Sequence, residues 1–580
     1  MKKYIIITLL ILGMFGSCNE ELEIVPQAVI TEEDAIPTEE WIEQLVNATY
    51  GILDGNLDNS DVWRAAASNW VYGELSTDNA YKGSEPGDQP DLNSFETYAA
   101  FANSTYLDYK WRAVYEGINR GNIALNTIKN GLKEGTVTQE DINVLEGEIL
   151  FLRAHYHFEA KKIWNMIPYV DETVTTSIPN VDVDSWSLIE QDFQNAIERL
   201  PESRDNPVRA SKWTAIAYLA KAHMYQLDFA AAKPLLDDLI TNGPFELNAL
   251  YQDNFNFRTD NSPESVFAAQ FSANDGSTNG SNGNWGDVLN FPQTSAVASG
   301  CCGFFQPSQN LVNAFRTDEN GLPLLDTFND MDVKNDRGIA SDEPFKPTDQ
   351  NLDPRLDWTV GRRGINFLGW DVHPGSAWIR DPANGGPYLH KKTIYAAEDR
   401  GTANATNAWS QGVSAQNINI IRYAEVLLWR AEIAAQEGDL GIALDLVNQI
   451  RRRAANSAGF VEAVERITNN NGELVELRGL GIPAANYVIR EYPSFPNQEF
   501  AIKAVNFERR IELAMEGHRF FDLVRQERAA EVLNEYLSVE KTKTSHLSSA
   551  NFTAGQDEYF PLPQSIIDLS FGVLKQNRNQ

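Results

Sequence analysis

The segment Glu148–Val170, EILFLRAHYHFEAKKIWNMIPYV, decides the fold. Large apolar side chains recur in it at three- and four-residue steps, which places them on one face of a helix: Ile149, Leu152, Tyr156 and Ile163. Lys161 and Lys162 occupy the last turn, where cations suit the exposed carbonyl groups. Pro168 then favours an extended chain. The segment therefore predicts a central helix that leads directly into a second element.

Helical periodicity recurs on both sides of this segment. It covers residues 38–53, 106–129, 185–200, 211–226, 228–241, 420–437, 439–455 and 499–528. Thr38 can cap the first of these helices, and Thr138 with Asp141 resembles a capping box ahead of the central helix. Gly438 and Asp439 stop one helix and cap the next. We therefore expect a mainly α protein.

Two pairs of these helices resemble degenerate tetratricopeptide repeats, whose period is about 34 residues. Small residues alternate with aromatic ones in Trp213–Ala222, WTAIAYLAKA, and in Tyr423–Ala431, YAEVLLWRA. Helix pairs of this kind stack into a curved scaffold. We expect the repeats mainly at residues 106–241 and 420–455, within a single domain that spans residues 37–580.

Residues 54–104 and 245–417 depart from the helical pattern. They are rich in turn-forming residues, most clearly in Asp275–Gly283, DGSTNGSNG. Only short helices, such as Gln309–Phe315, and a few short strands are expected there. Because a loop region this long inside a compact chain is usually functional, we expect these two segments to carry a ligand-binding site.

Charge excludes some classes of function. The 580 residues carry a formal net charge of −33. Nucleic-acid binding requires basic surfaces that neutralise phosphate, and an acidic surface also disfavours contact with an anionic membrane. Beyond residue 17, no segment approaches the roughly 20 apolar residues of a membrane-spanning helix.

The N-terminus has the features of a secretory signal peptide over residues 1–17. Lys2 and Lys3 precede the apolar run Tyr4–Leu12, and Gly16 and Ser17 stand directly before Cys18. This arrangement resembles a bacterial lipobox, in which the cysteine is acylated and anchors the chain. We expect residues 18–36 to be an acylated tether; ordinary cleavage with a stray cysteine is the alternative.

Further motifs accompany the central segment, which itself contains Arg153–Phe158 and Trp164–Val170. In chain order they are Trp111–Asn122, Pro307–Phe315, Asp353–Arg355, Ile421–Glu425, Glu508–Asp522 and Phe560–Pro563. Each block alone is weak, but together they cover nearly the whole mature chain. In this order they resemble the SusD/RagB family of surface nutrient-binding lipoproteins of Bacteroidetes.

The resemblance implies a SusD-like fold, mainly α, with a repeat-like scaffold and a loop-rich ligand face. It further implies a lipoprotein on the cell surface at the outer membrane. Such a protein captures a glycan and delivers it to a TonB-dependent outer-membrane transporter of the SusC type. A peptide-binding lipoprotein of the RagB type is one alternative, and a structural repeat lipoprotein that binds protein partners is another.

Motifs for catalysis are missing from the sequence, so we do not expect an enzyme. There is no His-Glu-x-x-His, no Gly-x-Ser-x-Gly and no Walker loop. His155 and His157 face different sides of the central helix and are expected to be core contacts. The dense charges of the late helix are expected to form an internal salt-bridge network: Arg509, Arg510, Glu512, Glu516 and Arg519.

Glycan binding would require flat apolar surfaces and hydroxyl partners in a preformed site. Candidates in the early loops are Asp54, Asn56, Trp70, Asp78, Asn79 and Tyr81. Candidates in the later loop region are Trp285, Trp370, Trp378, Arg380 and Tyr395. For each of the later residues, packing in the core is the competing interpretation. The spacing Asp54-x-Asn56-x-Asp58 is interpreted first as a turn, second as a sugar contact and third as a weak calcium site, and no other cofactor is expected.

Cys301 and Cys302 are the only cysteines besides Cys18. In an oxidising compartment these neighbours can form a disulfide, with Gly300 and Gly303 supplying the backbone freedom. A vicinal disulfide presents a flat apolar plate on which a sugar ring could stack. Two buried free cysteines are the alternative.

Overall fold

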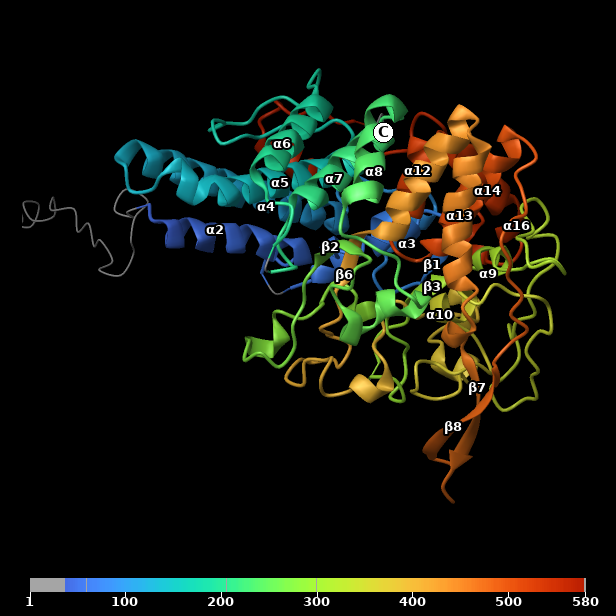
Figure 1. Ribbon diagram of the computed structural model, residues 1–580. Coiled ribbons are helices and arrows are strands. Elements are labelled where there is room, and N and C mark those ends of the chain that lie inside the picture. Colours follow the sequence, from blue (N-terminus) through green and yellow to red (C-terminus); the bar gives the residue numbers. More distant parts are fainter. Residues whose placement is uncertain (1–36, 59, 205, 299, 578–580) are drawn as a thin grey trace, which may run out of the picture.

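The computed structural model describes residues 37–58, 60–204, 206–298 and 300–577 (Figure 1). The chain is mainly helical, as predicted. The longer helices are α2 (Glu39–Gly51), α4 (Thr105–Glu134), α5 (Gln139–Trp164), α6 (Ser185–Arg199), α7 (Lys212–Tyr225), α8 (Phe229–Asn242), α12 (Tyr423–Glu437), α13 (Leu440–Ala454), α14 (Gln498–Glu512), α15 (Arg519–Arg525) and α16 (Ala529–Glu540). The shorter ones are α3 (Leu92–Glu96), α9 (Gln309–Ala314), α10 (Leu356–Thr359), α11 (Pro382–Gly385) and α17 (Gln564–Leu569).

The strands described form antiparallel pairs that are distant in sequence, except for one hairpin. β1 (Ala80–Gly83) pairs with β3 (Phe304–Pro307), and β2 (Ser265–Ala269) pairs with β6 (Ile418–Arg422). β4 (Val360–Gly361) pairs with β5 (Leu389–His390), and β7 (Glu462–Thr468) pairs with β8 (Leu474–Pro483). The β1–β3 and β2–β6 pairs tie the early and middle segments to the late ones.

Helix α5 lies at the centre of the helical scaffold. It packs against α4 and α6 (Figure 1), and its residues from Gly147 to Ala160 are all buried. Charged side chains of this buried stretch are ion-paired, as Arg153 is with Asp192 of α6, so burial on all sides leaves them compensated. Its start is the predicted capping box, because Thr138 and Asp141 exchange side-chain-to-backbone hydrogen bonds. His155 and His157 are core contacts, as expected, and burial lowers the pKa of both to about 3.

Three predicted helix boundaries are wrong. Helix α4 does not end near Gly131 but continues to Glu134, where Gly135 takes the left-handed conformation that ends a helix. Residues 420–422 belong to β6 rather than to α12, because they pair with β2. The predicted helix at residues 499–528 is divided into α14 and α15 by residues 513–518.

Buried ion pairs join the segments that meet at α14, which confirms the predicted salt-bridge network. Glu512 pairs with Arg355, Arg422 and Arg453. Each of these four side chains is at most 4% exposed. Because an isolated charge is costly in the interior, such a cluster is tolerated only when its members compensate one another. The network therefore holds the loop-rich region against the late helices.

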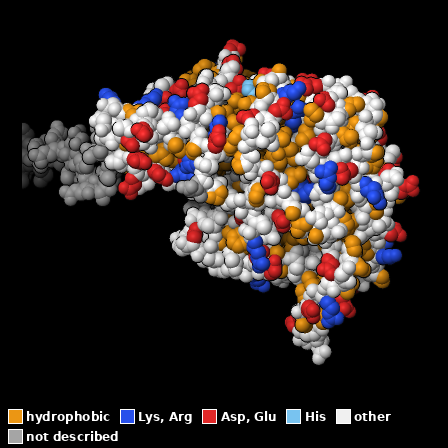
Figure 2. All heavy atoms as spheres, in the orientation of Figure 1, with side chains coloured by type: hydrophobic (Ala, Val, Ile, Leu, Met, Phe, Trp, Pro, Cys, Tyr) orange, Lys and Arg blue, Asp and Glu red, His pale blue; other side chains and the backbone are white. Residues whose placement is uncertain are grey.

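Much of the later loop-rich segment, residues 245–417, lies below the helices in Figure 1, and it contains a small core of its own, with Phe291, Phe367 and Ile394 among its residues. The β7–β8 hairpin, to which we had assigned no element, projects away from the body (Figures 1 and 2). Three large apolar side chains of β8 are exposed: Val475, Leu480 and Ile482. Among the described residues, none of the helices has the length and apolar character to cross a membrane.

Candidate ligand-binding site

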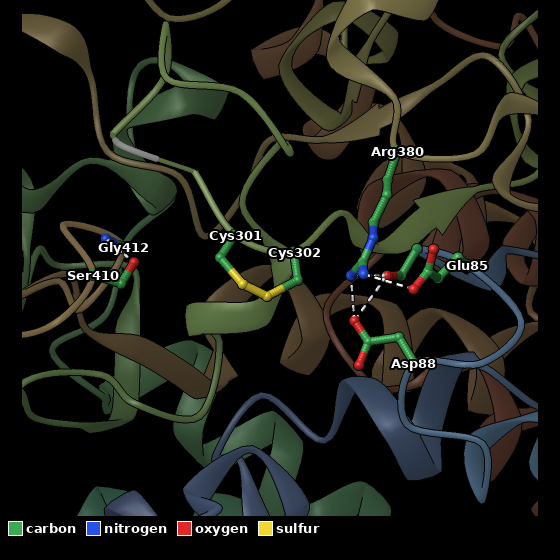
Figure 3. Close-up of a disulfide and its surroundings, with 8 residues drawn as sticks. Glu85, Asp88, Cys301, Cys302, Arg380, Ser410 and Gly412 are labelled. Atoms are coloured by element: carbon green, nitrogen blue, oxygen red, sulfur yellow. Dashed lines mark hydrogen bonds and ion pairs between the residues drawn. A yellow bond between two sulfur atoms is a disulfide. The ribbon is translucent and has the colours of Figure 1, made fainter.

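Cys301 and Cys302 are joined by a disulfide directly before strand β3 (Figure 3). Cys302 N donates to Leu289 O at 2.9 Å, and Ser84 N donates to Gly303 O at 2.6 Å. Gly300 has no room for a side chain, since a Cβ there would lie 1.7 Å from Pro292 O. The disulfide is thus fixed between two backbone segments, with Cys301 only partly buried.

Arg380 borders one side of the disulfide (Figure 3). Its guanidinium donates to Ser84 Oγ at 3.0 Å and pairs with Asp88 and with Glu85, the latter at 2.7 Å. The side chains of Glu85 and Asp88 are 49% and 24% exposed. Their oxygens are accessible acceptors for hydroxyl groups. Sequence analysis identified Arg380 but neither acidic residue.

Two tryptophans lie in chain segments that neighbour the disulfide: Trp285 comes shortly before Leu289, whose carbonyl accepts from Cys302 N, and Trp409 directly precedes Ser410. Ser410 and Gly412 lie beside the disulfide in Figure 3, and Gly412 packs against the ring of Phe291, whose carbonyl accepts from Gly303 N. Trp409, next to Ser410, is 59% exposed. Its ring centroid lies 6.2 Å from that of the half-buried Trp285, at an interplanar angle of 48°. Trp285 is held by a 2.9 Å hydrogen bond from its Nε1 to Gly280 O.

Trp409 is a residue that the sequence analysis missed. It stands alone in the polar stretch Asn407–Gly412, NAWSQG, and a large aromatic in such a stretch has little apolar surface to pack against. The polar composition around Trp409 was the signal from which its exposure could have been predicted. We use the name disulfide face for the disulfide together with the side chains of its neighbouring segments: Glu85, Asp88, Trp285, Arg380 and Trp409.

The structure corrects four candidates of the early loops. Trp70, Asp78, Asn79 and Tyr81 are each at most 2% exposed and cannot contact a ligand. The indole of Trp70 lies in the main core beside Phe304 and Phe305, and its Nε1 donates to Gly286 O. The hydroxyl of Tyr81 donates to the carboxylate of Glu540.

Asp78 and Asn79 brace the late helices instead. Asp78 forms ion pairs with Arg510 and Arg519, and Asn79 Oδ1 accepts from Arg510 Nε at 3.1 Å. Burial alone would raise the pKa of Asp78, but the two guanidinium groups outweigh it and lower that pKa to about 2. Asp78 therefore has a structural role, since it joins the early loop to Arg510 and Arg519.

Three candidates of the later loop region are also corrected. Trp370, Trp378 and Tyr395 belong to the small core of the loop-rich segments and are 8%, 5% and 1% exposed. Trp370 Nε1 donates to Tyr395 O, and the hydroxyl of Tyr395 donates to Gln411 O at 3.0 Å. Packing, the competing interpretation, applies to all three.

The Asp54-x-Asn56-x-Asp58 segment forms turns. Asp54 Oδ1 accepts from Asn56 N at 2.7 Å, and Asp58 Oδ1 accepts from Ser60 N at 3.1 Å. Asn56 Nδ2 reaches Ser281 O in the segment before Trp285, so Asn56 supports that segment rather than the disulfide. Among the described residues, no group of three or more His, Cys, Asp or Glu side chains is arranged to hold a metal ion.

The disulfide face therefore combines flat apolar surfaces with exposed carboxylate oxygens. Such a surface can bind a ligand that has both apolar faces and hydroxyl groups. The acylation site expected at Cys18 lies outside the described residues.

Comparisons with known proteins agree with this fold. Residues 263–579 match the family described as the SusD family, and residues 33–224 match a family described as starch-binding associating with outer membrane. The chain belongs to the SusD family. The family resemblance and the fold class predicted from the sequence are thus confirmed.

SusD-family relatives are distant but align over most of their length. SusD-like protein P38 of Formosa agariphila is 24% identical over 559 residues, which cover 92% of this chain and 94% of the relative. A solved laminarin binding SusD-like protein has a TM-score of 0.65 and 20% identity, covering 94% of this chain and 100% of its own. Surface glycan-binding protein A from Bacteroides thetaiotaomicron, in complex with laminarihexaose, has a TM-score of 0.64 and 19% identity, with 93% and 99% covered.

Proposed function

We propose that this protein binds a glycan at the disulfide face and acts without catalysing a reaction on it. The observation that carries the proposal is the exposed ring of Trp409, which directly precedes Ser410 in the loop drawn near the vicinal disulfide in Figure 3. Together with the half-buried ring of Trp285, the exposed indole of Trp409 offers a flat apolar surface of the kind that lines ligand sites. The laminarin-binding and laminarihexaose-bound relatives of the same fold support the choice of ligand class.

Binding at this face would combine stacking with hydrogen bonds. The C–H faces of sugar rings would lie on Trp409 and on the disulfide, while hydroxyl groups donate to Glu85 and Asp88. If a ligand covers roughly 100 Å² of the indole, the burial contributes about 2.5 kcal/mol at about 25 cal/mol per Å². This part of the affinity does not depend on the sequence of the glycan.

We further propose that the chain is anchored to the outer membrane through an acylated Cys18 and faces outward. Two observations support this location: the N-terminus resembles a lipobox, and residues 33–224 match a family described as associating with outer membrane. At the surface, the protein would hand the glycan to a TonB-dependent transporter of the SusC type. The transporter would cover the disulfide face, so that the ligand lies between two proteins. No metal or other cofactor is included in the proposal.

Calorimetric titration of the purified full chain tests the glycan proposal. The panel contains soluble polysaccharides, laminarin among them, and peptides of mixed sequence. Trp409→Ala should raise the Kd for the glycan that binds by about tenfold or more, which corresponds to at least about 1.4 kcal/mol. Trp41→Ala is the matched control, because Trp41 is 40% exposed on the distant helix α2. Binding of peptides alone, or unchanged glycan affinity in Trp409→Ala, would contradict the proposal.

A further inference from the structure

A cavity of about 370 Å³ lies in the loop-rich region, apart from the disulfide face. Its walls come from the turn around Phe255, from residues 366–369 and 391–398, and from Trp358 and Val461. Small-molecule sites in proteins are typically about 300–1,000 Å³, so the cavity is large enough for a ligand of one or two rings.

The small core of the loop region connects the cavity to the disulfide face. Ile394 lines the cavity, whereas the next residue, Tyr395, donates from its hydroxyl to Gln411 O and packs against Phe291. Phe291 O accepts from Gly303 N, directly after the disulfide. No residue of the disulfide face lines the cavity.

The apolar walls of the cavity include two aromatic rings. Trp358 is held by a hydrogen bond from its Nε1 to Gly459 O at 2.6 Å, and the ammonium of Lys391 lies 5.5 Å from its ring centroid. The ring of Phe255 is fixed from behind by Lys392, whose Nζ is 4.5 Å from the centroid. Both rings are therefore preorganised, which lowers the cost of binding a flat ligand.

Polar groups on the same walls offer both donors and acceptors. Gln252 lines the cavity, and its Oε1 accepts no hydrogen bond from the described residues, so no such bond fixes the orientation of its side-chain amide. Lys391 is 2% exposed, and its Nζ donates to Asp357 O and Asn366 O. Asn256, Asn366 and Glu398 complete the polar lining. A hydroxyl group, which donates and accepts, fits this set better than a purely apolar ligand does.

We propose that this cavity is a second carbohydrate site, which takes a single terminal or branching sugar unit while the disulfide face holds the extended chain. The proposal rests on the proposed glycan function. A hydroxyl of the sugar would bond to the side-chain amide of Gln252, turned toward the cavity, and one face of the ring would lie on Trp358.

Saturation-transfer NMR on the full chain tests the cavity with free monosaccharides as probes: D-glucose, D-galactose, D-mannose, D-xylose, L-fucose and D-glucuronate. Ala396→Phe fills the cavity and Gln252→Leu removes the side-chain amide from its wall. Their matched controls are Ala230→Phe and Gln191→Leu, at exposed positions of α8 and α6. Because Ala396→Phe could disturb local packing, the thermal midpoint of each variant is measured alongside.

At least one monosaccharide should give a saturation-transfer signal with the wild type and with Trp409→Ala. That signal should be reduced at least fivefold in Ala396→Phe and in Gln252→Leu. Both control variants should retain it. An undiminished signal in either cavity variant, or no monosaccharide signal in the wild type, would overturn the proposal. Polysaccharide binding that depends on Trp409 would then still support the disulfide face, so the two proposals fail separately.

Discussion

Two carboxyl groups only four residues apart, Glu74 and Asp78, are held in opposite electrostatic environments. Both are at most 2% exposed. Glu74 accepts from Asn79 Nδ2 and from Gly517 N, each at 3.0 Å, and has no ion-pair partner within 4 Å among the described residues. Burial therefore raises the pKa of Glu74 to about 7. At Asp78 the two guanidinium groups outweigh burial and lower the pKa of Asp78 to about 2.

Glu74 should make the unfolding free energy fall as the pH rises from about 4.5 to about 7. In this range the native state keeps a proton on Glu74 that the unfolded chain releases, so unfolding is favoured at higher pH. Glu74→Gln removes the effect. Its unfolding free energy relative to the wild type should increase by on the order of 3 kcal/mol between pH 4.5 and pH 8, measured by urea denaturation. A constant difference over this range would contradict the assignment, and no further change is expected between pH 8 and pH 9.

Sequence alone could not separate the exposed tryptophans from the buried ones. Trp70 and Trp409 both stand in loop-rich segments, but Phe304 and Phe305 of β3 pack on the first, whereas the second is 59% exposed. Which side chains a strand pair covers depends on contacts between residues more than 200 positions apart. Cys301 and Cys302 could be singled out, because their adjacency is itself a local feature.

At the scale of elements, a π-helical turn at Trp70–Glu74 packs closely on the segment that divides α14 from α15. A Cβ on Gly73 would lie 2.0 Å from Gly517 O, and one on Gly517 would lie 2.0 Å from Ser68 O. The backbones are thus in direct contact. This approach explains why the predicted helix at residues 499–528 is interrupted, a feature that helical periodicity cannot reveal.

Gly517→Ala should destabilise the protein by about 3 kcal/mol or more. The new Cβ meets backbone atoms, and Gly517 has a φ of 81°, which costs a non-glycine residue about 1–2 kcal/mol by itself. Gly135→Ala is the control, because its φ is 71° but nothing lies within 4 Å of its Cβ. Thermal denaturation should show a drop of only about 1 kcal/mol for Gly135→Ala. Equal losses in the two variants would contradict the close approach.

Local signals predicted the helical elements well. Capping residues such as Thr138 and Asp439 act within one turn, so they can be identified without knowledge of the fold. The β7–β8 hairpin was missed, because its strands are exposed on both faces and carry no clear apolar alternation.

At the scale of the whole molecule, Glu512 joins segments from across the second half of the chain. Its partners Arg355, Arg422 and Arg453 come from the loop-rich region, from β6 and from α13. Burial raises the pKa of Glu512, but the three guanidinium groups outweigh it and hold that pKa well below its usual range. The ion pairs therefore stabilise the fold above about pH 4.5 and lose that effect as the pH falls further.

Glu512→Gln should lower the unfolding free energy at pH 7 by about 3–5 kcal/mol, because it leaves three buried guanidinium groups without full compensation. Glu437→Gln is the matched control, since Glu437 pairs with Lys233 at the surface and should change stability by less than about 1 kcal/mol. Guanidinium chloride denaturation measures both variants. A loss below 1 kcal/mol for Glu512→Gln would show that the network does not hold the two regions together.

The most direct test of glycan binding at the disulfide face is a crystal structure of the protein with an oligosaccharide of the glycan that binds best in the titration. We expect the density of sugar rings over Cys301 and Cys302, in contact with Trp409 and within hydrogen-bond distance of Glu85 or Asp88. Sugar density that leaves the disulfide face unoccupied would contradict the central claim.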